Sequence, residues 1–218
     1  MKSTLSILLL GLTGLFASQP ANACTGITLK SKDGTTIVAR TIEWGGSDLK
    51  SQYVIVPRGY AAQSYTPEGV NGMKFTARYG YVGLAVEQKE FIAEGVNEAG
   101  LSAGLFYFPA YGEYENYNAA EKDNTISDLQ LVSWILGNCA TLDEVKEAVK
   151  SVHVVNIDPR SSTVHWRFTD PAGKQLVLEI TGQTSHFFEN NLGVLTNSPG
   201  FEWQLTNLNN YVNLFPGT

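Results

Sequence analysis

Hydrophobic and polar residues alternate along most of the chain after residue 23, a pattern typical of half-buried β-strands. The first two strand-like runs, in CTGITLKSKDGTTIVARTIEW, flank Asp33-Gly34, a dipeptide that favours a tight hairpin turn. Residues 97–100 and 170–173 have the composition of two more hairpin turns. Further strand-like runs lie at 51–59, 73–86, 91–108, 163–181 and 185–199.

One segment, residues 124–152, has apolar residues at helical spacing instead. Gly137-Asn138 interrupts it, and Thr141 with Glu144 forms a capping box that predicts the start of a second helix. Strands precede and follow this helical pair, and no repeat or long linker divides the chain. We therefore predict one α+β domain in which helices pack on antiparallel sheets.

Residues 1–23 have the three regions of a secretory signal peptide: Lys2, an apolar run over 5–16, and Ala21-Asn22-Ala23. The apolar run is too short to span a bilayer. Cleavage after Ala23 would make Cys24 the mature N-terminus and predicts a periplasmic or secreted protein. A lipoprotein signal also places a cysteine here, although Ala21 and Asn22 fit it less well, so a lipid-anchored binding protein is an alternative.

Composition narrows the classes of partner. The chain has 218 residues and a formal charge of −6, and the predicted leader carries only Lys2, so the remainder carries −7. An acidic balance argues against a nucleic-acid partner. No apolar run after residue 23 reaches membrane length, so we expect no membrane association after cleavage. Residues 24–218 are enough for one domain with its own core.

The two cysteines allow a disulfide, because export leads to an oxidising compartment. A Cys24–Cys139 bridge would indicate a non-catalytic exported domain. Against this, Cys139 lies in the apolar helical segment, where a cysteine most often behaves as a small buried hydrophobe.

Metal and cofactor chemistry have little support. His153, His165 and His186 lack the short spacings of zinc sites, and no glycine-rich loop follows a strand with phosphate-binding spacing. We therefore expect no metal and no cofactor. His165 alternates with Val164 and Trp166, which favours a cross-strand polar role. A cysteine–histidine hydrolase stays open, since such partners need not be sequence neighbours.

An N-terminal cysteine needs no histidine. Its thiol can be the nucleophile, and its own α-amine, with an unperturbed pKa near 8, can accept and return the proton. A nearby cation would favour the thiolate. The predicted hairpin brings Arg40 and Glu43 back alongside Cys24, although an exposed arginine–glutamate pair on a sheet would contribute little.

Four motifs together resemble the choloylglycine hydrolase family, which includes penicillin V acylases and conjugated bile salt hydrolases. They are CTGITL, ARTIEW, EGVNEAGLSAGLFYFPAY and GVLTNSPGFEWQLTNLNNY, in family order from Cys24 to the chain end. The resemblance implies an N-terminal-nucleophile hydrolase of linear amide C-N bonds, with a four-layer αββα sandwich that is incomplete in this chain. It also implies a small-molecule N-acyl amide substrate and a tendency to form homo-oligomers.

The resemblance also implies site residues. Cys24 matches the nucleophile, and Arg40 the arginine beside it. Glu43 falls where the family more often has an aspartate that holds the amine, and reaches one methylene further. Asn197 matches an oxyanion-hole asparagine. Tyr107 matches the second oxyanion position, where tyrosine is typical of penicillin acylases and would act chiefly through its main-chain N–H, so it favours an acylase over a bile salt hydrolase.

Each of these residues also has an ordinary explanation. Tyr107 lies in an aromatic strand, where a tyrosine is by default a core residue. Asn197 precedes Ser198-Pro199, where an asparagine is by default a turn former. Trp44, beside Glu43, is a candidate wall of an acyl pocket or a core aromatic. The family's last active-site arginine lies beyond the equivalent of Thr218. The signal peptide suits the Gram-negative branch, where the resemblance also implies action on N-acyl homoserine lactones.

Overall fold

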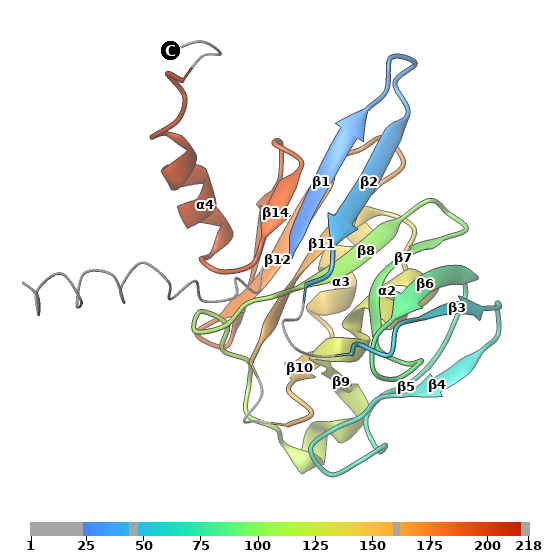
Figure 1. The fold of residues 1–218 in the computed structure, drawn as a ribbon. Coiled ribbons are helices and arrows are strands. Elements are labelled where there is room, and N and C mark those ends of the chain that lie inside the picture. Colours follow the sequence, from blue (N-terminus) through green and yellow to red (C-terminus); the bar gives the residue numbers. More distant parts are fainter. Residues whose placement is uncertain (1–23, 44–47, 159–161, 215–218) are drawn as a thin grey trace, which may run out of the picture.

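Two β-sheets packed face to face dominate the computed structural model, which describes residues 24–43, 48–158 and 162–214 (Figure 1). In the described part, the larger sheet is antiparallel in the order β13-β12-β11-β8-β7-β6-β3, and the smaller is β14-β1-β2. The larger sheet comprises β3 (Gln52–Val56), β6 (Tyr81–Ala85), β7 (Ile92–Asn97), β8 (Ser102–Tyr107), β11 (Val164–Thr169), β12 (Gln175–Thr181) and β13 (Thr184–Glu189). The smaller comprises β1 (Thr25–Lys30), β2 (Thr36–Thr41) and β14 (Val194–Thr196).

The remaining elements are short. They are the hairpin of β4 (Ala61–Gln63) and β5 (Lys74–Thr76), the parallel pair β9 (Thr125–Ser127) and β10 (His153–Val155), the 3-10 turns η1 (Ala119–Asn124) and η2 (Asp128–Gln130), and the helices α2 (Leu131–Asn138), α3 (Leu142–Val149) and α4 (Phe201–Leu208).

The three predicted hairpin turns are confirmed. Each ends on a glycine with positive φ: +87° at Gly34, +84° at Gly100 and +84° at Gly173. A residue without Cβ adopts this conformation at little cost. At the first turn the Asp33 side chain also accepts a hydrogen bond from the Thr35 N–H at 3.0 Å, so the turn that joins β1 to β2 is fixed locally.

The predicted helical pair is also confirmed. α2 ends at Asn138, within the interruption, and α3 begins after Thr141, whose hydroxyl accepts from the Glu144 N–H at 3.2 Å. The Glu144 carboxylate reaches back to the Ala140 N–H at 2.6 Å, one residue before the N-cap, so the capping box is slightly displaced. α2 packs its apolar side chains on β7 and β8.

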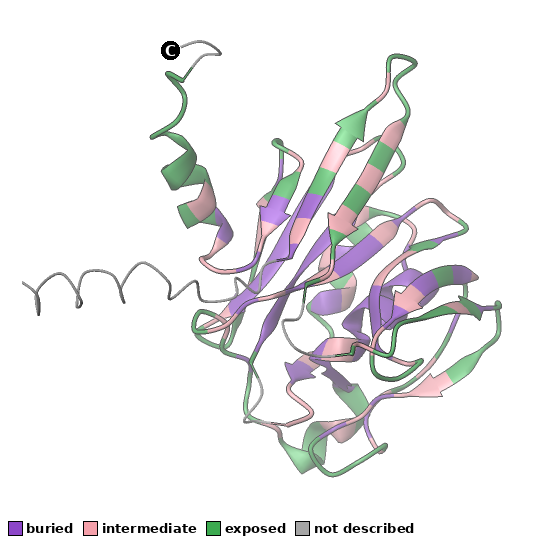
Figure 2. Cartoon of the chain, in the orientation of Figure 1, coloured by how far each residue is buried: buried purple, intermediate pink, exposed green. Residues whose placement is uncertain are grey.

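Two apolar clusters fill the two sides of the larger sheet. Figure 2 shows that the central strands of this sheet are largely buried. The cluster under the helices includes Cys139, which confirms the prediction of a buried hydrophobe. Burial raises the pKa of Cys139 to about 12, so its thiol stays protonated at neutral pH. Cys24 lies in the other cluster, between the sheets, and both cysteines are free, so the alternative of a bridge between them is not supported.

The order of layers follows from these clusters. Helices α2 and α3, the larger sheet and the smaller sheet stack in that order, which confirms the α+β sandwich. α4 follows β14, and Phe201 is its buried residue. The outer face of the smaller sheet carries exposed apolar side chains, among them Leu29 and Ile37. In the described ranges, no helix has the length and apolar character needed to cross a membrane.

Asp128 is a buried carboxyl in η2, between β9 and α2, and it should make stability depend on pH. Burial raises its pKa to about 7, against the lowering effect of the Leu129 N–H, which donates to it at 2.9 Å. The unfolded chain releases this proton near pH 4, whereas the folded chain keeps it to about pH 7. Asp128 therefore costs no stability below pH 4. Between pH 4 and pH 7 it lowers the free energy of unfolding by about 1.4 kcal/mol per pH unit.

We expect Asp128→Asn to remove this dependence. Urea unfolding at pH 5 and pH 8 should show the variant gaining about 2–3 kcal/mol relative to the unchanged protein as pH rises. Asp143→Asn, at a carboxylate that is 94% exposed, is the matched control and should gain nothing. Parallel pH profiles for Asp128→Asn and the unchanged protein would contradict the assignment.

Candidate active site

The hairpin places Arg40 on the same face as Cys24. In the β1–β2 ladder Gly26 pairs with Arg40, and Cys24 lies two residues before Gly26. Because alternate strand residues share a face, Cys24, Gly26 and Arg40 all point toward the larger sheet. Their burial agrees, since Cys24 is 4% exposed and the Arg40 side chain 5%. The juxtaposition predicted from the sequence for Cys24 and Arg40 is therefore present.

Strand β14 brings Asn197 to the other side of Cys24. β14 runs antiparallel to β1, with Thr25 opposite Thr196. Cys24 and Asn197 are the next residues along the two strands, just past the end of this pairing. Asn197 is 7% exposed. Two residues that are 173 positions apart are thus made neighbours by one short strand pairing.

Glu43 reaches Cys24 through its main chain. The Cys24 Sγ lies 3.9 Å from the carbonyl oxygen of Glu43, at the end of the hairpin strand. Glu43 as a whole is exposed. The predicted role of its carboxylate in holding the α-amine stays a prediction. Trp44, the predicted pocket wall, lies outside the described residues.

Arg40 is held between the sheets by main-chain oxygens. Its Nη1 donates to the Ala93 carbonyl at 3.2 Å and to the Leu105 carbonyl, and its guanidinium lies 4.0 Å from the centroid of the Phe106 ring. These carbonyls belong to β7 and β8, next to the last paired residues of that ladder. The contacts leave Arg40 little freedom, so its charge stays on the Cys24 side of the larger sheet.

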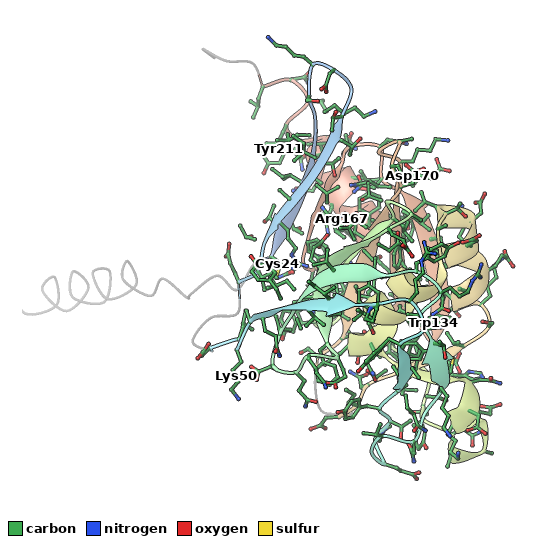
Figure 3. All side chains as sticks on the ribbon, turned by 90° about the vertical axis from the view of Figure 1, so that its right-hand side faces the viewer. Cys24, Lys50, Trp134, Arg167, Asp170 and Tyr211 are labelled. Carbon is green, nitrogen blue, oxygen red and sulfur yellow. The ribbon has the colours of Figure 1, made fainter. Side chains whose placement is uncertain are left out.

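A second arginine, Arg167 on β11, joins this site (Figure 3), and the sequence pattern did not predict it. Its Nη2 contacts Glu94 Oε1 at 3.3 Å, while Glu94 Oε2 lies 3.6 Å from Arg40 Nη1. Arg167 is 1% exposed. In the sequence, the feature that could have indicated Arg167 is a charged residue in the middle of the strand-like run VHWRFT. In the structure every position of this strand is buried.

The two glycines that face this cluster make space for it. A Cβ built on Gly26 would be 2.7 Å from Phe106 Cζ and would also clash with Arg167 Nη1. A Cβ on Gly104 would clash with the Glu94 carboxylate. Gly26 and Gly104 therefore serve packing here, since neither has positive φ.

The cluster carries an excess of positive charge. Burial raises the pKa of Glu94, and the guanidiniums of Arg167 and Arg40 oppose that rise. Burial lowers the pKa of Arg167, Glu94 raises it, and Arg40 lowers it. Two guanidiniums share one carboxylate, so the site favours an additional negative charge. A cysteine thiolate or the oxyanion of an attacked carbonyl would supply such a charge.

Tyr107 ends β8 with its hydroxyl 2.8 Å from Ser162 Oγ. Its partner in the β8–β11 ladder is Val164. The Val164 N–H donates to the Tyr114 hydroxyl and the Val164 carbonyl accepts from it, so these two groups are not directed at Tyr107. The Tyr107 N–H therefore points away from β11, to the edge of β8 where the Leu105 carbonyl accepts from the site arginine. This direction suits the predicted main-chain role for Tyr107.

The histidines do not gather into a ligand set. In the residues that the structure describes, no three His, Cys, Asp or Glu side chains lie close enough to hold a metal ion. His165, predicted as a cross-strand polar residue, contacts Glu179 on the neighbouring strand β12, which confirms that expectation.

Comparisons with known proteins agree with this geometry. The family model described as linear amide C-N hydrolases, choloylglycine hydrolase family, matches residues 24–218. A bile salt hydrolase/transferase from Clostridium perfringens is 34% identical over 197 residues, which cover 88% of this chain and 58% of that protein. The chain thus spans about three fifths of the length of this curated relative.

Solved structures show the same overlap. A crystal structure of a variant of the conjugated bile acid hydrolase from Clostridium perfringens has a TM-score of 0.76 at 32% identity, covering 88% of this chain and 58% of that one. The penicillin V acylase from Agrobacterium tumefaciens has a TM-score of 0.75 at 24% identity, covering 89% and 60%. The second likeness shows a common fold only.

We expect Gly26→Ala to destabilise the protein, because the added methyl group must displace Arg167 or Phe106. Overpacking of this kind costs about 1–3 kcal/mol, which denaturant unfolding would detect. Ala39→Ser, at an exposed position of β2, is the control and should change stability little. An unchanged unfolding free energy for Gly26→Ala would show that the guanidinium does not lie against β1.

Proposed function

The chain belongs to the choloylglycine hydrolase family of linear amide C-N hydrolases, and on that premise we propose that the mature protein is a cysteine amidohydrolase of the penicillin V acylase type. Cys24 is the nucleophile, and its free α-amine is the base. The fold is that of the N-terminal-nucleophile hydrolases.

The observation that carries the proposal is the pairing of β1 with both β2 and β14. On this pairing we assign Arg40, on the neighbouring strand β2, and Asn197, at the end of β14, to the site of Cys24, and all three residues are largely buried. A thiol, a cation and an amide donor are three of the groups that attack on a carbonyl requires. The α-amine would be supplied by cleavage after Ala23, once the leader had directed the protein to the periplasm or out of the cell.

The reaction follows from these positions. The α-amine of Cys24 takes the thiol proton, and the thiolate attacks the carbonyl carbon of an N-acyl amide. The oxyanion accepts hydrogen bonds from the Tyr107 N–H and the Asn197 side chain. The C–N bond then breaks, the ammonium returns its proton to the leaving amine, and a thioester remains on Cys24. Water, deprotonated by the same amine, releases the acyl group as a carboxylic acid and restores the thiol.

The charged cluster and Glu43 have supporting roles in this scheme. Arg40, with Glu94 and Arg167 behind it, provides net positive charge that favours the thiolate. The Glu43 carboxylate accepts a hydrogen bond from the α-amine and so orients it. No metal or cofactor is needed for any step.

Among the candidate substrates we favour penicillin V, because Tyr107 matches the second oxyanion position, where tyrosine is typical of the penicillin acylases of this family. The relative from Clostridium perfringens is named for bile salts, and N-acyl homoserine lactones carry the same acyl amide group. The three differ in the shape of the acyl and amine portions. Side-by-side hydrolysis assays on the full-length mature protein would rank them, with penicillin V expected first.

The decisive kinetic test compares three forms of the protein. We expect the mature protein to hydrolyse penicillin V, and both Cys24→Ala and a form that keeps residues before Cys24 to be inactive. The extended form is the sharper case, because its thiol is intact and only the free α-amine is missing. Full activity in the extended form would exclude the α-amine as the base.

Variants at the oxyanion positions complete this test. Asn197→Ala should lower kcat by about 10²–10³-fold, the usual cost of one oxyanion donor. Tyr107→Phe should keep most of the activity, because the main-chain N–H is retained. Cys139→Ala is the matched cysteine control, since that thiol lies in the other apolar cluster. Equal losses for Cys139→Ala and Cys24→Ala would contradict the assignment of the nucleophile.

A further inference from the structure

We propose that His165 and Glu179 form a buried imidazolium–carboxylate pair that positions Asn197 by holding both ends of its loop. Neither residue touches the substrate, so both are positioning residues. The inference deepens the proposed function, because it rests on Asn197 serving the oxyanion.

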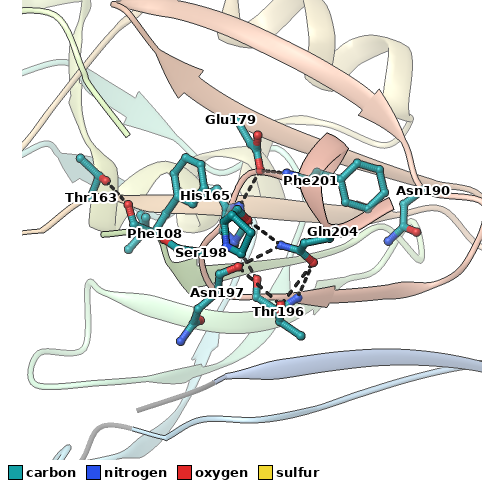
Figure 4. A network of polar contacts seen from close by, with 12 residues as sticks. Phe108, Thr163, His165, Glu179, Asn190, Thr196, Asn197, Ser198, Phe201 and Gln204 are labelled. Atoms are coloured by element: carbon teal, nitrogen blue, oxygen red, sulfur yellow. Dashed lines mark hydrogen bonds and ion pairs between the residues drawn. The ribbon is translucent and has the colours of Figure 1, made fainter. Parts of the chain in front are cut away.

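His165 is completely buried, and both of its ring nitrogens have partners (Figure 4). Nδ1 lies 3.0 Å from Glu179 Oε1, and Nε2 lies 2.9 Å from the carbonyl oxygen of Thr196. The ring is stacked on Phe108, with 4.4 Å between centroids and 6° between planes. Phe106 meets it edge-on at 6.2 Å.

The partners determine where the hydrogens are. The Thr196 carbonyl can only accept, so Nε2 must carry a hydrogen. Glu179 Oε1 accepts from the Phe201 N–H at 2.8 Å and lies within hydrogen-bond distance of Nδ1, and a single hydrogen between Nδ1 and Oε1 belongs on the more basic imidazole nitrogen. Nδ1 must then donate as well. With both nitrogens donating, His165 is an imidazolium, and the stacked face of Phe108 favours that charge.

The other groups around the pair agree with a charged state. The ring is contacted by Phe106 on β8, by Phe108 just after β8, and by the Thr196 carbonyl on β14. On β13, His186 is opposite Glu179 in the ladder and is exposed. Within the described ranges, Glu179 is the ionisable group in hydrogen-bond contact with His165. Each buried charge is thus compensated by its partner.

The pair holds the Asn197 loop at its two ends. His165 binds the Thr196 carbonyl immediately before Asn197, and Glu179 binds the Phe201 N–H where α4 begins. Between these points the Gln204 side chain donates to the carbonyls of Asn197 and Pro199 at 2.9 and 2.8 Å. Figure 4 shows these contacts meeting around the loop.

Rigid placement matters because an oxyanion donor acts only when it is in position before the charge forms. A shift of about 1 Å in a catalytic group can cost about 100-fold in rate. The residues between β14 and α4 have no regular secondary structure, so precise placement of Asn197 must come from contacts such as these. The buried pair supplies it from β11 and β12, two central strands of the larger sheet.

The charge state can be tested without catalysis. In ¹⁵N NMR spectra of the full-length mature protein at pH 8, both ring nitrogens of His165 should carry protons, and Glu179→Gln should remove one of them. The exposed His186 is the internal reference. A single ring N–H on His165 in the unchanged protein would overturn the inference, whatever the enzyme hydrolyses.

The positioning role has a kinetic test. Glu179→Gln keeps an acceptor for the Phe201 N–H but removes the charge, and should lower kcat about 10–100-fold with KM changed less than about threefold. Glu115→Gln is the matched control, because Glu115 pairs with His153 at 2.6 Å on the exposed surface, away from the loop. An equal loss of kcat in both variants would overturn the positioning role.

A double variant separates positioning from general damage to the fold. If Glu179 acts through Asn197, adding Glu179→Gln to Asn197→Ala should cost almost nothing more. Additive losses would show that Glu179 acts elsewhere. If Asn197→Ala itself leaves kcat unchanged, the proposed function fails at that residue, while the NMR result still decides the charge state of the pair.

Discussion

The pairing of β1 with a strand on each side is the constraint from which the site follows. β2 returns from a tight turn and β14 arrives from the far end of the described chain, and both align antiparallel to β1. A slip of one residue in either ladder would turn Arg40 or Asn197 to the outer face. Turn chemistry at Gly34 and the buried face of the smaller sheet together prevent that slip.

Two groups of charged side chains are buried between the sheets. Arg40, Glu94 and Arg167 lie together on one flank of Phe106, and His165 with Glu179 lies on another. Burial penalises each of these charges, and ion pairs, main-chain oxygens and aromatic faces offset the penalty. The first cluster keeps an excess positive charge beside Cys24, whereas the second is balanced. The site therefore combines a group that attracts negative charge with a support that is electrically neutral.

Local signals in the sequence predicted the local parts of the fold. Asp33-Gly34 predicted the hairpin that returns Arg40, and Thr141 with Glu144 predicted the start of α3. Arg167 was not predicted, because its partner Glu94 is 73 residues away, and alternation indicates a face but not the neighbouring strand. Glu179 and the Thr196 carbonyl were missed as partners of His165 for the same reason. Only the resemblance to a family connected Asn197 with Cys24 in advance.

The most direct measurement is mass spectrometry of the mature protein, mixed with penicillin V and quenched in acid within one turnover. We expect a peptide that begins at Cys24 and carries the acyl group of the substrate as a thioester. An acyl group on another residue, or on a peptide that begins before Cys24, would contradict the claim that a free N-terminal cysteine is the nucleophile.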